Sequence, residues 1–150
     1  MSLLTLASSR SAWYGYDYYK AKNVVSFRQI DATEIQGLVK GSGDNQYEVL
    51  IDIERPRKSK CNCPHADGKR IICKHMIAVF FAAFPKEAEK YYADVVAYEL
   101  EEEKRQEEMA HAVASYVGKL KKAELQKLLL EILLEGPEWQ YERFVRNYIE

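Results

Sequence analysis

The chain has 150 residues, of which 47% are hydrophobic and 30% are charged, and its net charge is −1. This balance is typical of a globular protein rather than a disordered one, and no apolar run approaches the ~20 residues that cross a bilayer. Three cysteines, an odd number, argue against a disulfide framework and favour a reducing compartment. Because the opening MSLLTLASSR also lacks the basic start of a secretory signal, we expect a cytoplasmic or otherwise intracellular protein that is not secreted.

The N-terminal residues show little regular patterning. Residues 1–12 are rich in serine, and we expect them to be loose. The aromatic cluster that follows has two interpretations: its rings stack on nucleic-acid bases, or they cover a thin sheet whose own core is small. The cluster consists of Trp13, Tyr14, Tyr16, Tyr18 and Tyr19. The small size of the domain favours the second interpretation.

Three strands are predicted next from alternating polarity and β-branched content. They cover residues 24–30, 34–40 and 47–53. A turn-rich link, GSGDN, joins the second to the third, so an antiparallel meander is the natural topology. Pro56 is expected to end the pairing of the third strand, because proline has no backbone N–H to donate.

Two ligand pairs follow the predicted sheet. Cys61 and Cys63 are two residues apart, which places both sulfurs on one face of an extended segment. Cys73 and His75 converge only if Cys73 lies just ahead of a helix and His75 lies in its first turn, and the apolar run 76–84 supplies that helix. Three sulfurs and one imidazole are the donor set of a closed tetrahedral site. We therefore predict one structural Zn²⁺, held by Cys61, Cys63, Cys73 and His75.

This stretch resembles the SWIM zinc finger, in which a Cys-x-Cys pair, a variable loop and a Cys-x-His pair lead into an apolar helix. CKHMIAVFFA, residues 73–82, is similar to the helix entry of that family. GYDYYKAKNV (15–24) and LVKGSGDNQYEVLIDI (38–53) look like the short strands that precede its ligands. The resemblance covers residues 15–84. Because that family is held to bind DNA or proteins, the resemblance implies a role in nucleic-acid-associated processes without identifying the ligand.

His65 departs from the family pattern. It lies in Cys-Pro-His, directly beside the first ligand pair. Two interpretations stay open: His65 is a loop residue near the metal, or it replaces His75 as the fourth ligand.

The C-terminal half reads as helical. Helices are predicted over 76–84, 86–118, 120–134 and 139–149, and Gly136-Pro137 separates the last two into a hairpin. The helix 76–84 has no polar face, so we expect the sheet to cover one side and the C-terminal helices another. The leucine-rich face of the hairpin, with Leu128 and Leu129, is either core or the surface for a homo-oligomer or another protein.

These elements predict an α+β fold. A small antiparallel three-stranded sheet with a zinc knuckle and a helix forms a zinc-finger domain over residues 13–85. A helical C-terminal region, 86–150, follows it.

Charge is unevenly distributed along the chain. Residues 1–85 hold 12 Lys and Arg against 8 Asp and Glu, whereas the remainder holds 10 against 15. Cations concentrate around the zinc ligands and suggest phosphate contacts. The candidate nucleic-acid-binding residues are Arg55, Arg57, Lys58, Lys69 and Arg70. The acidic helices and the near-neutral whole chain favour the alternative, a protein partner.

No enzymatic motif accompanies the ligands. The zinc-deaminase signature, the Walker loop and Gly-x-Ser-x-Gly are all missing from the sequence. A catalytic zinc usually keeps a position open, whereas four protein ligands fill this one. We therefore expect a binding module and not an enzyme.

Overall fold

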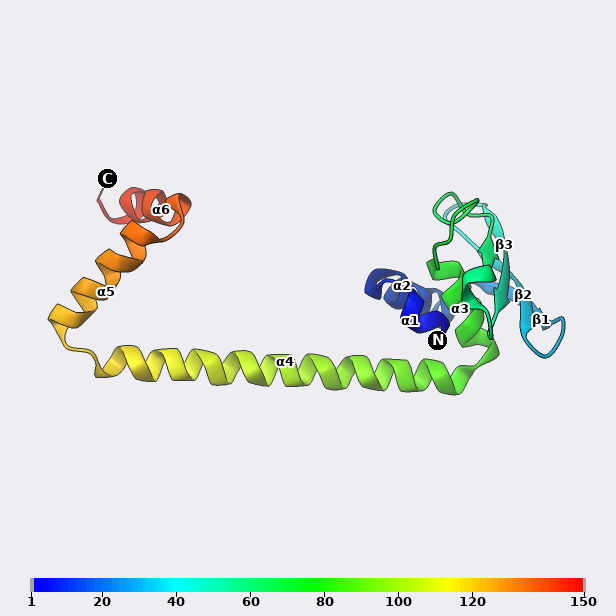
Figure 1. The fold of residues 1–150 in the computed structure, drawn as a ribbon, viewed down its shortest axis with the longest axis horizontal. Helices are drawn as coiled ribbons and strands as arrows, with labels where there is room; N and C mark the ends of the chain where they lie inside the picture. The colour runs from blue at the N-terminus through cyan, green and yellow to red at the C-terminus, as the bar shows by residue number, and fades with distance from the viewer. Residues whose placement is uncertain (1, 150) are drawn as a thin grey trace. The chain divides into compact units, whose positions relative to one another are not determined.

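The computed structural model describes residues 2–149 (Figure 1). The chain divides between Val96 and Ala97 into two compact units, which are described separately. The first unit is α+β and holds the predicted zinc ligands, and the second is helical. None of the described helices combines the length and the apolar character needed to cross a bilayer.

The first unit begins with two helices, α1 (Leu3–Leu6) and α2 (Ser9–Lys20). The expectation of a loose N-terminus is wrong here, and so is the expectation of a strand beginning near Gly15. The serines cause the difference, because they cap helices. Ser2 Oγ accepts a hydrogen bond from the Thr5 N–H at 3.2 Å, and Ser8 Oγ accepts one from the Ser11 N–H at 3.1 Å.

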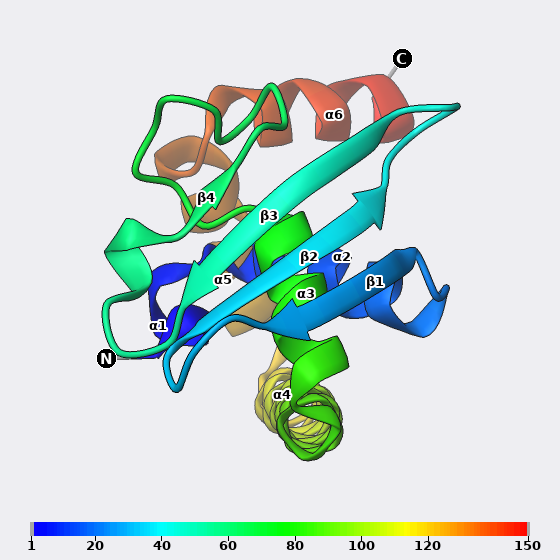
Figure 2. The same ribbon diagram turned by 90° about the vertical axis from the view of Figure 1, so that its right-hand side faces the viewer.

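The predicted meander is confirmed, and a short fourth strand extends it. The strands β1 (Val24–Gln29), β2 (Glu34–Lys40), β3 (Gln46–Asp52) and β4 (Lys60–Cys61) pair antiparallel in chain order (Figure 2). The third strand ends at Asp52, ahead of Pro56, but the sheet gains a further strand beyond the proline. The 3-10 turn η1 (Pro56–Lys58) reverses the chain, and β4 then pairs with β3 through Val49 opposite Cys61.

The connection from β3 to β4 is held by a buried carboxylate. Asp52 is 1% exposed. Its side chain accepts hydrogen bonds from the Arg55 backbone N–H at 2.7 Å and from Arg55 Nε at 3.0 Å. The Asp52 N–H in turn donates to Ser59 Oγ at 3.0 Å. This network carries the chain around to the first ligand strand.

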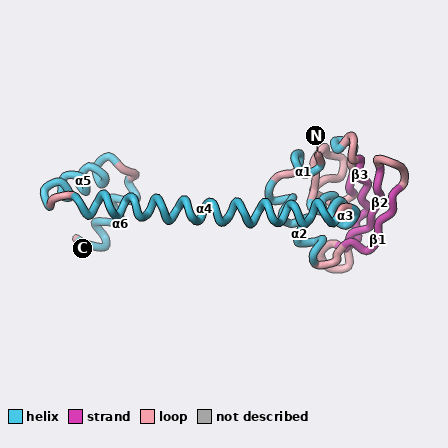
Figure 3. Tube along the Cα trace, turned by 90° about the horizontal axis from the view of Figure 1, so that it is seen from below, coloured by secondary structure: helices cyan, strands magenta, loops and turns pink. Residues whose placement is uncertain are grey.

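Helix α3 (Lys74–Ala83) lies at the centre of the first unit. The sheet covers one side of it (Figures 2 and 3). Most of the large, fully buried side chains come from the sheet and from α3 itself, namely Val39, Val49, Ile51, Met76, Ile77, Val79 and Phe81, and Leu3 of α1 joins them. A helix that is apolar all round needs this cover on more than one side, as the sequence predicts.

The other side of α3 is covered mainly by α2, and of the C-terminal helices expected there from the sequence, the first turns of α4 (Pro85–Lys119) contribute. Gly15 permits a close approach: a Cβ on it would lie 2.4 Å from Ile77 Cβ. Tyr16 packs edge-on against Phe81, with ring centroids 5.9 Å apart. The first turns of α4 add Tyr91, whose ring lies 6.0 Å from that of Tyr16. The aromatic cluster therefore packs mainly on a helix and not on the sheet.

The second unit contains the rest of α4, α5 (Lys122–Glu135) and α6 (Glu138–Tyr148). The predicted helices are present, and α5 and α6 contact each other across Gly136-Pro137. Most side chains of its leucine-rich face are exposed to solvent. Leu133 is buried, whereas Leu125, Leu129 and Ile132 are exposed. The interpretation of this face as core does not hold within the described residues.

Gly15→Ala tests the approach of α2 to α3. The added methyl would overlap Ile77, so we expect the first unit to lose about 1–3 kcal/mol of unfolding free energy in urea with zinc saturating. Gly118→Ala is the control, because a Cβ there meets no atom within 4 Å. Equal stability of the two variants would contradict this packing.

Candidate metal centre

Four side chains from two segments of the chain meet where the sheet ends and α3 begins. Cys61 belongs to β4, and Cys63 follows two residues later. Cys73 is the N-cap residue of α3, in extended conformation with φ −93° and ψ 168°, and His75 lies in the first turn. All four are buried, and their ligand atoms lie within 4.8 Å of one another. The structure thus brings together the four residues that the sequence predicts as ligands.

The spacing within the cluster fits a single zinc ion. His75 Nδ1 lies 3.7 Å from Cys61 Sγ and 4.0 Å from Cys73 Sγ. Tetrahedral zinc with Zn–S of ~2.3 Å and Zn–N of ~2.1 Å puts neighbouring ligand atoms about 3.6 Å apart. The cluster therefore closes around an ion with little movement.

The electrostatics of the cluster also favour a cation. The hydrogen bond shared with Cys73, followed by burial, raises the pKa of Cys61. Burial and the charge on Cys73 raise the pKa of Cys63. The same bond from Cys61, assisted by His75, lowers the pKa of Cys73 to about 4. Three buried thiolates repel each other, and a cation at the centre of the cluster would remove that repulsion.

A tight loop returns the chain from the first ligand pair to the second. The carbonyl of Cys63 accepts hydrogen bonds from the N–H groups of Ala66 and Asp67, at 3.0 and 2.9 Å. Gly68 then takes φ +68°, a left-handed conformation that glycine adopts without strain. His65 lies exposed in this loop and outside the ligand cluster. Of the two interpretations, the geometry therefore favours His75 as the fourth ligand.

Two tyrosines enclose the imidazole of His75. Tyr47 of β3 stacks on it with centroids 4.6 Å apart, and Tyr18 of α2 meets it edge-on at 5.4 Å. Lys74 Nζ donates to the Tyr18 hydroxyl at 2.8 Å. The other ring nitrogen of His75, Nε2, is buried with no hydrogen-bond partner among the described residues. Aromatic packing thus orients a ring that usually relies on a carboxylate or a carbonyl.

Sequence reasoning missed this pair of tyrosines. Tyr18 and His75 are 57 positions apart along the chain, so no local spacing connects them. The available signal was the N-terminal aromatic cluster, which was interpreted as cover for a sheet or as a stacking surface.

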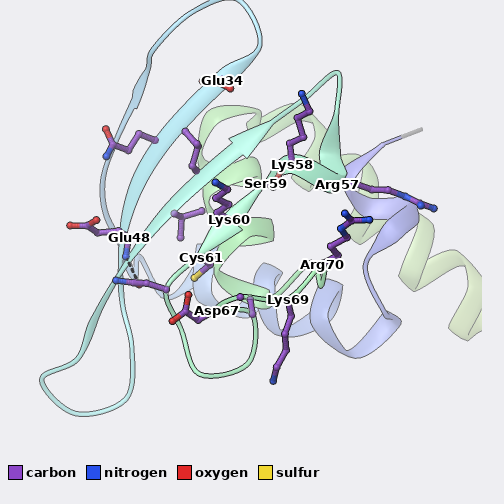
Figure 4. A pocket seen from close by; sticks show the side chains of 16 residues that line it. Glu34, Glu48, Arg57, Lys58, Ser59, Lys60, Cys61, Asp67, Lys69 and Arg70 are labelled. Atoms are coloured by element: carbon purple, nitrogen blue, oxygen red, sulfur yellow. Dashed lines mark hydrogen bonds between the residues drawn. The ribbon is translucent and has the colours of Figure 1, made fainter.

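The cations around the ligands line a shallow groove of about 890 Å³ on the outer side of the sheet (Figure 4). Four of the predicted phosphate contacts line it, namely Arg57, Lys58, Lys69 and Arg70. Lys60 of β4, which the sequence analysis does not single out, lines it too. Arg55 is outside the groove lining and pairs with Asp52 at 3.0 Å.

Comparison with known proteins identifies the segment that carries the cluster. Residues 47–84 match the family model of the SWIM zinc finger. The match begins at β3 and ends just beyond α3, and it includes all four ligands. No curated protein and no solved structure gives a significant match.

His75→Ala and His65→Ala separate the ligand from its neighbour. Apparent zinc binding of about 10–16 kcal/mol in structural sites equals or exceeds the stability of a small domain. We therefore expect His75→Ala to lose its zinc and the folded first unit, whereas His65→Ala keeps one zinc per chain. Elemental analysis and thermal melting measure both quantities. Zinc retained by His75→Ala and lost by His65→Ala would reverse the assignment.

Tyr47→Leu tests the orientation of the imidazole. Without the stacked ring His75 has more freedom before it binds the metal, so we expect zinc affinity to fall by about tenfold in competition with a chromophoric chelator. Tyr14→Leu, a change on the exposed side of α2, is the matched control. An unchanged affinity in Tyr47→Leu would mean that the stack does not position the ligand.

Proposed function

The chain carries a SWIM-type zinc finger with one structural zinc, and from this premise we propose that it is a nucleic-acid-binding module. The zinc serves as a scaffold and not as a reagent, because Cys61, Cys63, Cys73 and His75 supply all four positions of a tetrahedral ion. The module binds through phosphate contacts on the outer side of the sheet, and it catalyses no reaction.

The observation that carries this proposal is the convergence of five cations on one groove. They come from three segments: η1 supplies Arg57 and Lys58, β4 supplies Lys60, and the loop supplies Lys69 and Arg70. In Figure 4 the long side chains of Arg57, Lys58 and Lys69 extend outward from the backbone. Cations spread over such a surface can contact successive phosphates.

The zinc ion fixes the positions of these segments relative to one another. Cys61 and Cys63 fix the end of β4, and Cys73 fixes the chain just after Arg70. The loop that carries Lys69 and Arg70 is thus closed at both ends by the same ion. Metal binding and the arrangement of the cations are therefore coupled.

Carboxylates moderate the positive charge of the groove. Glu34, Glu48 and Asp67 also line it, so its net formal charge is +2. We therefore expect a small number of phosphate contacts and a moderate affinity, and not the steep salt dependence of a strongly basic protein.

A second candidate function is protein binding by the helical region. It is favoured by a separate observation, the exposure of most large apolar side chains of α5 and α6. Exposed apolar surface of this extent is typical of an interaction site.

Arg57→Ala with Lys58→Ala tests the nucleic-acid proposal. Each lost phosphate contact lowers the slope of log affinity against log salt by ~0.9 on a duplex, so we expect the slope on mixed-sequence DNA to fall by about 1.8. Fluorescence anisotropy over a salt series measures it.

The control is Arg143→Ala with Arg146→Ala, which makes the same change of charge on α6. This variant should leave the slope as it is. Absence of DNA binding, or an equal slope in both double variants, would contradict the proposal.

A further inference from the structure

The groove beside the metal centre continues across the outer face of the sheet. A second hollow of about 260 Å³ lies next to it and is lined mainly by residues of β1 and β2. Gln36 and Glu48 line both hollows, so the two are continuous, and we call them together the outer sheet surface. Arg28 of β1 is the cation that lines the second hollow.

The strand register places two cations at opposite ends of one row across this surface. The row runs from β1 to β4 (Figure 2) and consists of Arg28, Gln36, Leu50 and Lys60. The alternate residues Ile35, Val49 and Ile51 are buried on the α3 side, so the row faces away from α3. Neighbouring strands lie ~4.8 Å apart, so three gaps separate the ends of the row by roughly 14 Å.

Both terminal cations are held in position and are free to meet an anion. Gln36 Oε1 accepts hydrogen bonds from Arg28 Nε at 3.2 Å and from Arg28 Nη2 at 2.8 Å, which fixes the plane of the guanidinium. Lys60 is exposed, and its backbone is held by pairing with Leu50. Neither cation forms an ion pair among the described residues.

The centre of the surface has a different chemistry from its ends. The β2 and β3 residues that line it include no cation, and Glu48 adds a negative charge. The Glu48 N–H donates to Asn62 Oδ1 at 2.9 Å, which leaves the amide nitrogen of Asn62 available as a donor. The ends therefore suit phosphates, whereas the centre suits uncharged groups that form hydrogen bonds, such as the edges of bases.

The surface also lacks the aromatic rings on which single-stranded nucleic acid stacks. Phe27 lines the second hollow, but it is paired with Gly37, where an added Cβ would lie 2.6 Å from Val79 of α3. Phe27 therefore belongs to the α3 side of the sheet. The exposed rings of Trp13 and Tyr14 are on α2, which covers α3 from the other side.

We propose that the ligand of the outer sheet surface is B-form duplex DNA, with the sheet facing its major groove and Arg28 and Lys60 contacting the backbones of opposite strands. That groove is about 12 Å wide, which fits two long cationic side chains whose backbones are roughly 14 Å apart. At the centre, Glu48 accepts from the amino group of cytosine and Asn62 donates to N7 of a purine. The major groove of an RNA duplex is too narrow for this arrangement.

This inference rests on the proposed function, to which it adds a ligand class and the contact residue Arg28. Fluorescence anisotropy of the full zinc-loaded chain compares a mixed-sequence DNA duplex with one of its strands alone and with the corresponding RNA duplex. We expect the DNA duplex to bind at least about tenfold more tightly than either alternative.

The outcomes separate the two proposals. A single strand or an RNA duplex that binds as tightly as the DNA duplex would overturn the inference and leave the nucleic-acid proposal in place. Absence of binding to all three probes would contradict the proposed function itself.

Arg28→Gln tests the new contact. Loss of one phosphate contact lowers the slope of log affinity against log salt by ~0.9, so we expect that fall on the DNA duplex. Arg10→Gln is the matched control, because it makes the same change of charge at an exposed position of α2. Equal slopes in the two variants would overturn the assignment of Arg28.

Arg28→Lys separates the charge of Arg28 from its bond to Gln36. Lysine keeps the positive charge but has no planar group to make both hydrogen bonds, so we expect the slope of the unmodified chain. A slope as low as that of Arg28→Gln would show that Arg28 acts through Gln36 and not on a phosphate, against the proposal.

Dimethyl sulfate identifies the groove that faces the sheet, because guanine N7 lies in the major groove and adenine N3 in the minor groove. Saturating protein should slow methylation of guanine N7 in the DNA duplex and leave adenine N3 unchanged. Protection confined to adenine N3 would overturn the major-groove assignment.

Discussion

Three buried sulfurs and one imidazole at the start of α3 are the constraint on which the first unit depends. Without a cation three thiolates in so small a volume would repel each other. A zinc ion removes this repulsion and joins the end of the sheet to the central helix. The loop between the ligand pairs, with its cations, is thereby fixed as well.

The features that the sequence predicts correctly are local ones. Alternating polarity gives the three strands of the meander, and the spacing of Cys73 and His75 requires the helix start that α3 provides. The N-terminal helices escaped prediction because serine content suggests a loop until Ser2 and Ser8 are recognised as caps. The strand β4 was missed because it is only two residues long, which is too short to show an alternating pattern.

The features of the metal site likewise separate into those that the sequence predicts and those that it does not. Its ligands follow from motif spacing, whereas the aromatic enclosure of His75 depends on Tyr18, a contact that only the folded chain creates. Net charge along the sequence indicates a basic segment. The division between Arg55, which stabilises a turn through Asp52, and Arg57, which lines the groove, depends on the path of the chain through η1.

The position of α2 determines where the folded zinc-finger domain begins along the chain. The family match starts at Tyr47, yet the helix that covers α3 and supplies Tyr18 ends before residue 21. A fragment trimmed to the matched segment would expose Ile77 and Phe81 to solvent and would leave the imidazole open on one side. The autonomous folding unit is therefore longer than its recognisable motif, and truncation for expression should spare the N-terminal helices.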